Sequence, residues 1–445
     1  MSGAAVAVPP PSNVTLLRRI YRLAAPTTLV VVLQVIGQLT ETWLAARQGT
    51  AALAGWAVVL PFALLMNMAS AGAMGGGVVS AVARALGAKQ PELASALVLH
   101  AVLIALAAGG LFMVLLAGMP YRLFSLIAGP ETAAEAAPYA MWLFGAGAVP
   151  VWLTNTLASV LRGGGRHGLA SRVLSTGGAV SPFLAWFLME PCGAGLKGAG
   201  MAVAIVFAVS AVAMAIPVLR GAAGFVPNLR LRPRAALFRQ ILAVGLVASM
   251  MAAIANLTTI LVTAQIAPYG PTVVAAYGIS ARLEFLMIPL AFGIGSALTA
   301  LVGQAVGAGD WTLARRTAWA GGCVALCVAG SVGFTVALLP EGFARLFTAD
   351  AAVVAVATQA LTFVAPACAG FGIGMALYFA SMGAARMKGP VIAAFTRISL
   401  AVFGGWVLAN GAGMGLAGHF LAVALGITAY GAIMAAAVRP AIWRG

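Results

Sequence analysis

The sequence predicts an all-α membrane protein with about twelve transmembrane helices, arranged as two six-helix lobes related by a pseudo-twofold axis along the membrane normal. The 445 residues are 62% hydrophobic and only 8% charged, with a mean hydropathy of +1.05. No soluble domain could bury that much apolar surface. Basic residues gather between alternate apolar runs, which is typical of membrane loops. The second half of the chain also repeats features of the first half.

The apolar runs are separated by short polar connections, and each run is long enough to cross a bilayer as a helix. We expect helices at 20–46, 53–84, 93–118, 133–161, 169–190, 196–219, 237–267, 272–302, 315–339, 352–382, 389–409 and 414–437. The resulting plan is an N-terminal tail (1–19), an N-lobe (20–219), a linker (220–236), a C-lobe (237–437) and a C-terminal tail (438–445). The first thirteen residues lack an apolar core, so we interpret them as a tail and not as a signal peptide.

The distribution of basic residues predicts the topology. If both chain ends lie on one side, that side receives 20 of the 25 Lys and Arg residues, Arg397 among them. The other side receives four, and Arg282 falls within a span. The positive-inside rule then places both termini in the cytoplasm and supports an even number of spans. The basic residues form loop ends and not one interleaved patch, so the charge of +16 does not indicate a nucleic-acid partner.

Short sequence matches relate the two halves. Residues 85–88 (ALGA) correspond to residues 305–308 (AVGA) at an offset of 220. Ser159 corresponds to Ser381 at an offset of 222. Because each half starts in the cytoplasm and holds six helices, the repeats are parallel, and transporters of this kind bind their substrate between the halves.

The first apolar segment carries a polar stripe. Thr27, Gln34, Gln38 and Glu41 are spaced by seven, four and three residues, which places them on one helix face. Such a stripe is costly in hydrocarbon, so we expect it to face a water-filled cavity. Pro26 at the foot of the same helix removes a backbone donor and is expected to bend the axis.

Glu41 and Glu190 are expected to lie at the same depth. Glu41 follows Arg22 by nineteen residues, and Glu190 follows Arg172 by eighteen, which places both acids roughly 27–29 Å from their cytoplasmic arginines. We expect the two carboxyl groups to pair and to load and release a proton near neutral pH. The alternative is that both are solvated ends at the outer membrane surface.

Further polar residues interrupt later apolar segments. Glu284 lies in the middle of the eighth segment, where a carboxylate is functional by default, and the alternative is a structural ion pair with Arg282. Asn155 and Asn256 are predicted to line the cavity, although hydrogen bonding between helices is the more common use of such residues.

Several segments resemble transporters of the multidrug and toxic compound extrusion (MATE) family. Residues 301–316 (LVGQAVGAGDWTLARR), preceded by 273–295, resemble the start of the second half in that family. Residues 84–94 (RALGAKQPELA) and 157–168 (LASVLRGGGRHG) resemble loops of the first half, and residues 23–45 resemble the first helix. The resemblance covers nearly the whole chain and implies twelve helices in two lobes.

The resemblance also implies roles for individual residues. Glu41 stands where the first helix of the family usually has an aspartate, and Pro26 matches a bending proline. Glu190 takes the place of an aspartate that precedes a proline in the fifth helix, and Tyr139 matches a tyrosine of the fourth. With the expected pairing of Glu41 and Glu190, our hypothesis is that protonation bends or rotates the Pro26 helix and closes the N-lobe cavity.

The chain departs from the family pattern at other positions. Trp186 replaces an asparagine one turn before the fifth-helix acid, and a nearby threonine corresponds to Ile205. The acids of the seventh and tenth helices in sodium-coupled members fall near Ala255 and Gly372. A carboxylate-rich cation site in the C-lobe is therefore not expected.

The function implied is a bacterial inner-membrane antiporter that exports organic, often cationic, compounds in exchange for protons. A sodium-coupled drug antiporter and a flippase for a lipid-linked precursor are the alternatives, and for the flippase we expect Arg282 to be the only cation in the cavity. We expect no enzyme activity, no cofactor beyond H⁺ or Na⁺, and no metal site, since the three histidines are scattered. The expected partners are the lipid bilayer and small organic cations, and we expect a monomer.

Overall fold

In a computed structural model that describes residues 12–230 and 232–444, the described part of the chain forms helices joined by short loops and contains no strand. Residues 1–11 of the expected N-terminal tail, Leu231 of the linker and Gly445 lie outside the described residues. The helices of the first half are α1 (Asn13–Arg47), α2 (Thr50–Asn67), η1 (Met68–Met74), α3 (Gly75–Gly87), α4 (Pro91–Ala117), α5 (Pro120–Ala140), η2 (Met141–Ala146), α6 (Ala148–Gly163), α7 (His167–Met189) and α8 (Leu196–Leu219). Those of the second half are α9 (Ala235–Ile266), η3 (Ala267–Tyr269), α10 (Pro271–Gly307), α11 (Trp311–Leu338), α12 (Pro340–Arg345), α13 (Ala351–Gly383), α14 (Lys388–Ser399), η4 (Leu400–Gly404), η5 (Val407–Gly411) and α15 (Leu416–Ala437).

Ten helices of the described chain are long and apolar enough to cross a membrane, and an eleventh span is a pair bent by 44° between Ala146 and Ala148. Helix α7 is less apolar, but its 23 residues reach about 34 Å at 1.5 Å per residue, which is the length of a span. One face of α7 lines a cavity, and a helix in that position need not be apolar all round. Within residues 12–230 and 232–444 the chain is therefore a multi-pass membrane protein with ten or eleven candidate spans, and α7 supplies a further helix of spanning length.

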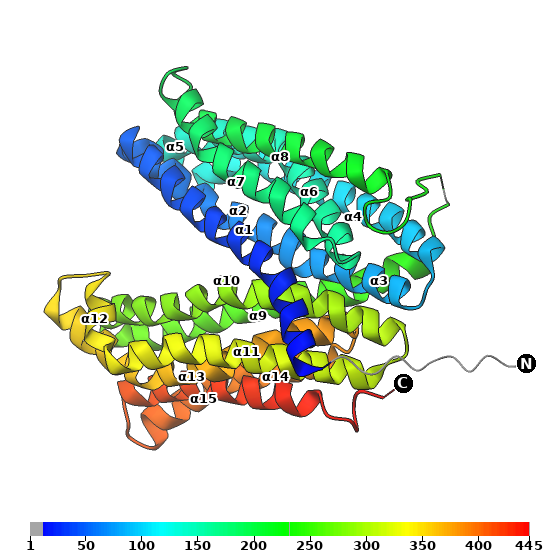
Figure 1. The fold of residues 1–445 in the computed structure, drawn as a ribbon. Helices are drawn as coiled ribbons and strands as arrows, with labels where there is room; N and C mark the ends of the chain where they lie inside the picture. The colour runs from blue at the N-terminus through cyan, green and yellow to red at the C-terminus, as the bar shows by residue number, and fades with distance from the viewer. Residues whose placement is uncertain (1–11, 231, 445) are drawn as a thin grey trace, which may run out of the picture.

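The two halves form separate lobes that meet at one end (Figure 1). Helices α1 to α8 make up the upper lobe in this view and α9 to α15 the lower lobe, and each lobe has its own apolar core. Both ends of the described chain lie at the end where the lobes meet, and the ribbons diverge toward the opposite end. Helix α1 crosses from the N-lobe to pack against α10, which links the lobes.

Backbone geometry repeats between the lobes at the same offset that relates residues 85–88 to residues 305–308. After α3, the amide of Gln90 donates to the carbonyl of Ala85 at 2.9 Å, and after α10 the amide of Asp310 donates to Ala305 at 2.9 Å. The residues before these amides, Lys89 and Gly309, both have positive φ. The fold thus contains two copies of one helical unit.

The same offset holds after the fourth span of each lobe, which corrects one expected match. The amide of Arg166 donates to Leu161 at 2.8 Å, and the amide of Arg386 donates to Ser381 at 2.9 Å. Arg166 therefore corresponds to Arg386, and Leu161 corresponds to Ser381. The expected match of Ser159 to Ser381 is wrong, because it would shift the register by two positions.

Glycines allow the lobes to touch at the end near the termini. A methyl group on Gly87 would overlap the backbone of Gln304, and one on Gly307 would overlap the backbone of Arg84. A methyl group on Gly77 would lie 2.7 Å from the carbonyl oxygen of Ile241 on α9. Small residues let membrane helices approach this closely, and here they seal one end of the space between the lobes.

Polar contacts reinforce this seal. The Arg84 guanidinium and the Ser80 hydroxyl on α3 both donate to the carbonyl oxygen of Gly383 on α13, each at 3.2 Å. The buried guanidinium of Arg162 lies 5.8 Å from the ring centroid of Phe292 on α10, a cation–π arrangement between lobes. These contacts join helices from opposite lobes.

Candidate functional site

A cavity of about 520 Å³ lies between the lobes. Its walls come from both lobes, including α1, α2 and α7 on one side and α9, α10, α13 and α14 on the other. The walls are mostly apolar, with aromatic side chains at Phe285, Phe371, Tyr378 and Phe379. A few polar groups converge on this apolar surface, which is the usual composition of a small-molecule site.

The polar stripe of the first helix reaches this cavity in part. Gln34, Gln38 and Glu41 on α1 line the cavity, together with the buried Tyr139 of α5. Thr27 does not line it, because its buried hydroxyl faces the Nδ1 atom of His167 at 3.4 Å. The 3.6-residue period thus correctly placed three of the four residues on the cavity wall, and only Thr27, the first of the four in the sequence, lies outside it.

Glu41 lies among aromatic residues and has no ion-pair partner among residues 12–230 and 232–444. The indole of Trp56 and the phenol of Tyr139 lie near its carboxyl group. The Trp56 indole nitrogen is buried and makes no hydrogen bond of normal geometry in the described chain. A carboxyl group in such surroundings, open to a cavity, is suited to exchange a proton or to bind a cation.

Glu190 does not pair with Glu41, contrary to our expectation. It follows the last residue of α7, and its Oε1 atom accepts from the Nε atom of Arg47 at 2.8 Å. Its Oε2 atom accepts from the Trp186 indole at 3.0 Å, and Glu190 is not part of the cavity wall. These contacts are those of a helix end. Equal depth in the membrane was not enough to predict pairing, because depth fixes the height of a side chain and not its direction around the helix.

The two asparagines have different positions. Asn155 is buried on α6, does not line the cavity, and donates to the Ser70 hydroxyl at 2.8 Å. Ser70 lies in the π-helical segment η1, so this bond ties two segments of the N-lobe together. Asn256 lines the cavity from α9, and its amide donates to the carbonyl of Ala252 at 2.9 Å. The expectation for Asn155 as a cavity residue is therefore wrong.

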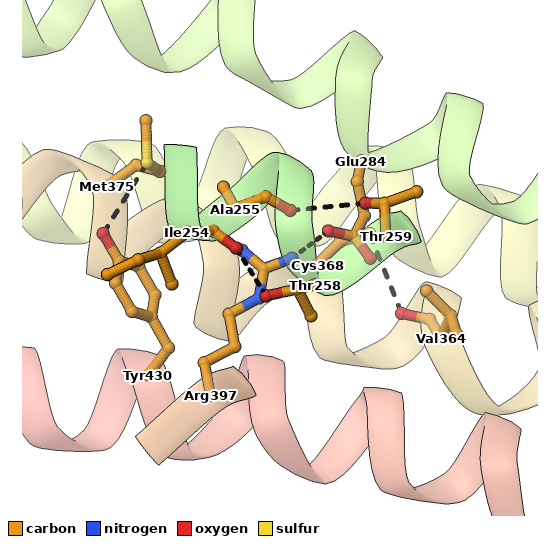
Figure 2. A network of polar contacts seen from close by, with 10 residues as sticks. All are labelled: Ile254, Ala255, Thr258, Thr259, Glu284, Val364, Cys368, Met375, Arg397 and Tyr430. Atoms are coloured by element: carbon orange, nitrogen blue, oxygen red, sulfur yellow. Dashed lines mark hydrogen bonds and ion pairs between the residues drawn. The ribbon is translucent and has the colours of Figure 1, made fainter. Parts of the chain in front are cut away.

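The C-lobe contributes an ion pair to the cavity wall. Glu284 on α10 accepts a hydrogen bond from the Nη2 atom of Arg397 on α14, and both residues line the cavity (Figure 2). The alternative considered for Glu284, an ion pair with Arg282, is not formed. The exposed guanidinium of Arg282 lies instead 5.1 Å from the ring centroid of Phe347. Arg397 was expected at the cytoplasmic surface and lies instead beside the cavity.

Sequence reasoning missed Arg397 and Trp56 as neighbours of the acids. Arg397 lies eight residues inside the expected span 389–409, so its depth was available as a signal. Trp56 gave no signal, because an aromatic residue in an apolar helix is common.

Pro26 lies within α1, which continues as a helix on both sides of it. No group of three His, Cys, Asp or Glu side chains gathers in the described ranges.

A profile of the MatE family matches residues 26–187 and again residues 247–407. The starting points of the two matches differ by nearly the structural offset, and one match falls in each lobe. The probable multidrug resistance protein NorM of Deinococcus radiodurans is 29% identical over 448 residues, covering 93% of each chain. The protein of the same description from Xanthomonas campestris pv. campestris is 30% identical over 256 residues, 54% of this chain and 53% of that relative. In that second alignment the chain spans about half the length of the relative.

Solved structures share the fold. The Vibrio cholerae MATE transporter VcmN in its bent form has a TM-score of 0.88 at 19% identity, with 97% of this chain and 98% of that chain covered. A MOP superfamily transporter from Pyrococcus furiosus has a TM-score of 0.86 at 22% identity, with 98% and 99% covered. At these identities the similarity concerns the fold, and it extends over nearly the whole of each chain.

Proposed function

Because the chain belongs to the MatE family of multidrug and toxic compound extrusion proteins, we propose that it is a multidrug efflux antiporter that exports organic cations in exchange for protons. The relatives described as multidrug resistance proteins support the substrate class. The bacterial relatives and the excess of basic residues near the termini support a place in the inner membrane with both termini cytoplasmic.

The observation that carries the proposal is Glu41, a carboxyl group without an ion-pair partner in the described chain, on the wall of a cavity between two lobes. An organic cation gains from the aromatic walls and from a negative charge. A proton and a cation cannot both neutralise the same carboxylate. Binding of one therefore releases the other, which is the elementary step of an exchanger.

Alternating access requires that the lobes change their relative positions around the cavity. The glycine contacts of Gly87 and Gly307 and the bonds of Ser80 and Arg84 close the end near the termini. With cytoplasmic termini, this arrangement is the outward-facing state. Return to an inward-facing state would separate α3 from α10 and expose the same cavity to the other side.

Proton coupling is favoured over sodium coupling by the ligands available. A sodium ion, like other hard cations, prefers several oxygen ligands. The position of Ala255 on the cavity wall offers no carboxylate, and Gly372 packs against the backbone of Ala325. The C-lobe acid Glu284 already has a cationic partner.

A lipid-linked precursor flippase is less well supported. A pyrophosphate group needs cations that are free to bind it. The expected cation, Arg282, does not line the cavity, and Arg397, which does, is paired with Glu284. The proposal therefore keeps small organic cations as the substrates.

Dye efflux from everted membrane vesicles tests the coupling ion. We expect an imposed proton gradient to drive ethidium transport, and an equal sodium gradient at fixed pH to have no effect. Vesicles without the protein provide the background. Transport driven by the sodium gradient alone would overturn the proton assignment, and transport under neither gradient would overturn the antiporter proposal.

A further inference from the structure

The C-lobe acid Glu284 differs from the N-lobe acid Glu41 in one respect. The positive charge that neutralises Glu284 is a side chain of the protein, Arg397. The side chains of Glu284 and Arg397 are 16% and 13% exposed, so the pair is mostly shielded from solvent. Among the described residues, Arg397 is the only side chain that forms an ion pair or hydrogen bond with Glu284. In such surroundings the Coulombic attraction between the two charges is stronger than in water, and removing either partner leaves an uncompensated charge.

The hydroxyl groups labelled near the pair in Figure 2, those of Thr258, Thr259 and Tyr430, have other partners. The hydroxyls of Thr258 and Thr259 donate to the carbonyls of Ile254 and Ala255 in their own helix, at 2.7 and 3.4 Å. The Tyr430 hydroxyl donates to the sulfur of Met375 at 3.7 Å. The neutralisation of Glu284 therefore depends on Arg397 alone among these groups, because each hydroxyl is already engaged elsewhere.

Without the guanidinium, the surroundings of Glu284 would suit an organic cation. The Arg397 guanidinium carbon lies 5.5 Å from the ring centroid of Phe371, so an aromatic face already receives a positive charge at this point. Phe285 and Tyr378 line the same cavity. A carboxylate with aromatic neighbours is the combination that binds ammonium and phosphonium ions.

We propose that Arg397 is a tethered cation that occupies Glu284 and thereby excludes organic cations from the C-lobe acid. This inference rests on the proposed function, in which organic cations enter the cavity. It makes Arg397 a residue that determines specificity, because it leaves Glu41 as the one acid of the described cavity wall that is open to the substrate. A single exchangeable charge would then limit the cavity to one cation per cycle.

Binding of tetraphenylphosphonium to the purified full-length protein, measured by equilibrium dialysis at pH 7, tests the proposal. Arg397→Met keeps much of the side-chain length and removes the charge, and we expect it to bind about tenfold more tightly than the wild type. Arg397→Lys retains a cation and should bind within about threefold of the wild type. The double variant Glu284→Gln/Arg397→Met should lose the gain. Unchanged binding by Arg397→Met, or a gain that survives in the double variant, would overturn the proposal.

The double variant also decides the matter if Arg397→Met does not purify as a folded protein. If the pair is already neutral in the wild type, replacing both residues should leave binding within about threefold. If Glu284 binds the cation directly, the double variant should lose binding, and the proposal fails. Gradient-driven transport of tetraphenylphosphonium by wild-type proteoliposomes separates the antiporter hypothesis from the Arg397 hypothesis. If the wild type does not transport the compound, the antiporter function is contradicted, while the comparison of binding between variants remains valid.

Discussion

Gly87 at the end of α3 lies directly against the backbone of Gln304 at the end of α10, with no room between them for a methyl group. The reciprocal contact places Gly307 of α10 against the backbone of Arg84 in α3. The offset between the lobes relates Gly87 to Gly307 and Arg84 to Gln304. The axis that relates the lobes therefore passes between these two helix ends, at the point where they seal the cavity.

Replacing Gly87 with alanine should weaken the seal. The added methyl group overlaps backbone that cannot rotate away, and overpacking of this kind costs about 1–3 kcal/mol. We expect the closed population to fall by about fivefold or more. Spin labels on cysteines introduced at the exposed residues Ala88 and Ala308, in a variant without the four native cysteines, should report a longer distance. Gly110→Ala is the control, since its methyl group has open space, and a similar distance change in that variant would contradict the prediction.

Replacing Glu41 with glutamine should reduce proton-driven dye efflux to the level of vesicles without the protein. Glutamine has nearly the same shape but neither carries a negative charge nor releases a proton. Expression and helical content should be unchanged. The control is Glu341→Gln, which removes an exposed carboxylate from the short helix α12. Proton-driven efflux at the wild-type rate in Glu41→Gln would exclude this residue from the coupling mechanism.

Replacing Glu190 with glutamine should change little. Its ion pair with Arg47 is at the protein surface, where such pairs contribute about 0–1 kcal/mol. We expect the thermal midpoint of the purified protein to shift by about 2 °C or less. Efflux should stay at the wild-type rate. A loss of efflux as large as that of Glu41→Gln would show that the helix end takes part in coupling.

Replacing Asn155 with alanine should destabilise the N-lobe. The buried amide bonds to Ser70, and removing one partner of a buried hydrogen bond costs about 1–3 kcal/mol. Asn256→Ala is the matched variant, because that side chain is exposed and bonds within its own helix. We expect a lower thermal midpoint for Asn155→Ala only. Equal midpoints would contradict the assigned role.

Hydropathy was sufficient to predict most of the fold. The expected helix 196–219 coincides with α8, and the expected helix 414–437 begins two residues before α15. Apolar runs bounded by glycine or charge leave little choice of position. The segment from Pro120 to Gly129 was missed as a helix, because it combines Arg122 with a turn at Gly129, where φ is 84°. The π-helical segments have no sequence signal of this kind.

The site was harder to predict for a geometric reason. A period of 3.6 residues places side chains on one face of one helix, and this was enough for Gln34, Gln38 and Glu41. Which residues of different helices meet depends on how each helix is rotated about its axis, and one sequence does not contain that information. The depth of Arg397 could be read from the sequence, but its pairing with Glu284, and that of Arg47 with Glu190, could come only from the structure.

The constant offset between the lobes has a consequence for how they could specialise. Arg397 corresponds to Gly177, which lines the opposite wall of the cavity, so the guanidinium has no counterpart in the N-lobe. A symmetric dimer of identical chains would present every side chain twice and could not hold a tethered charge on one wall and a bare acid on the other. Covalent fusion of the two copies removes that restriction while the glycine contacts at the seal keep their symmetry.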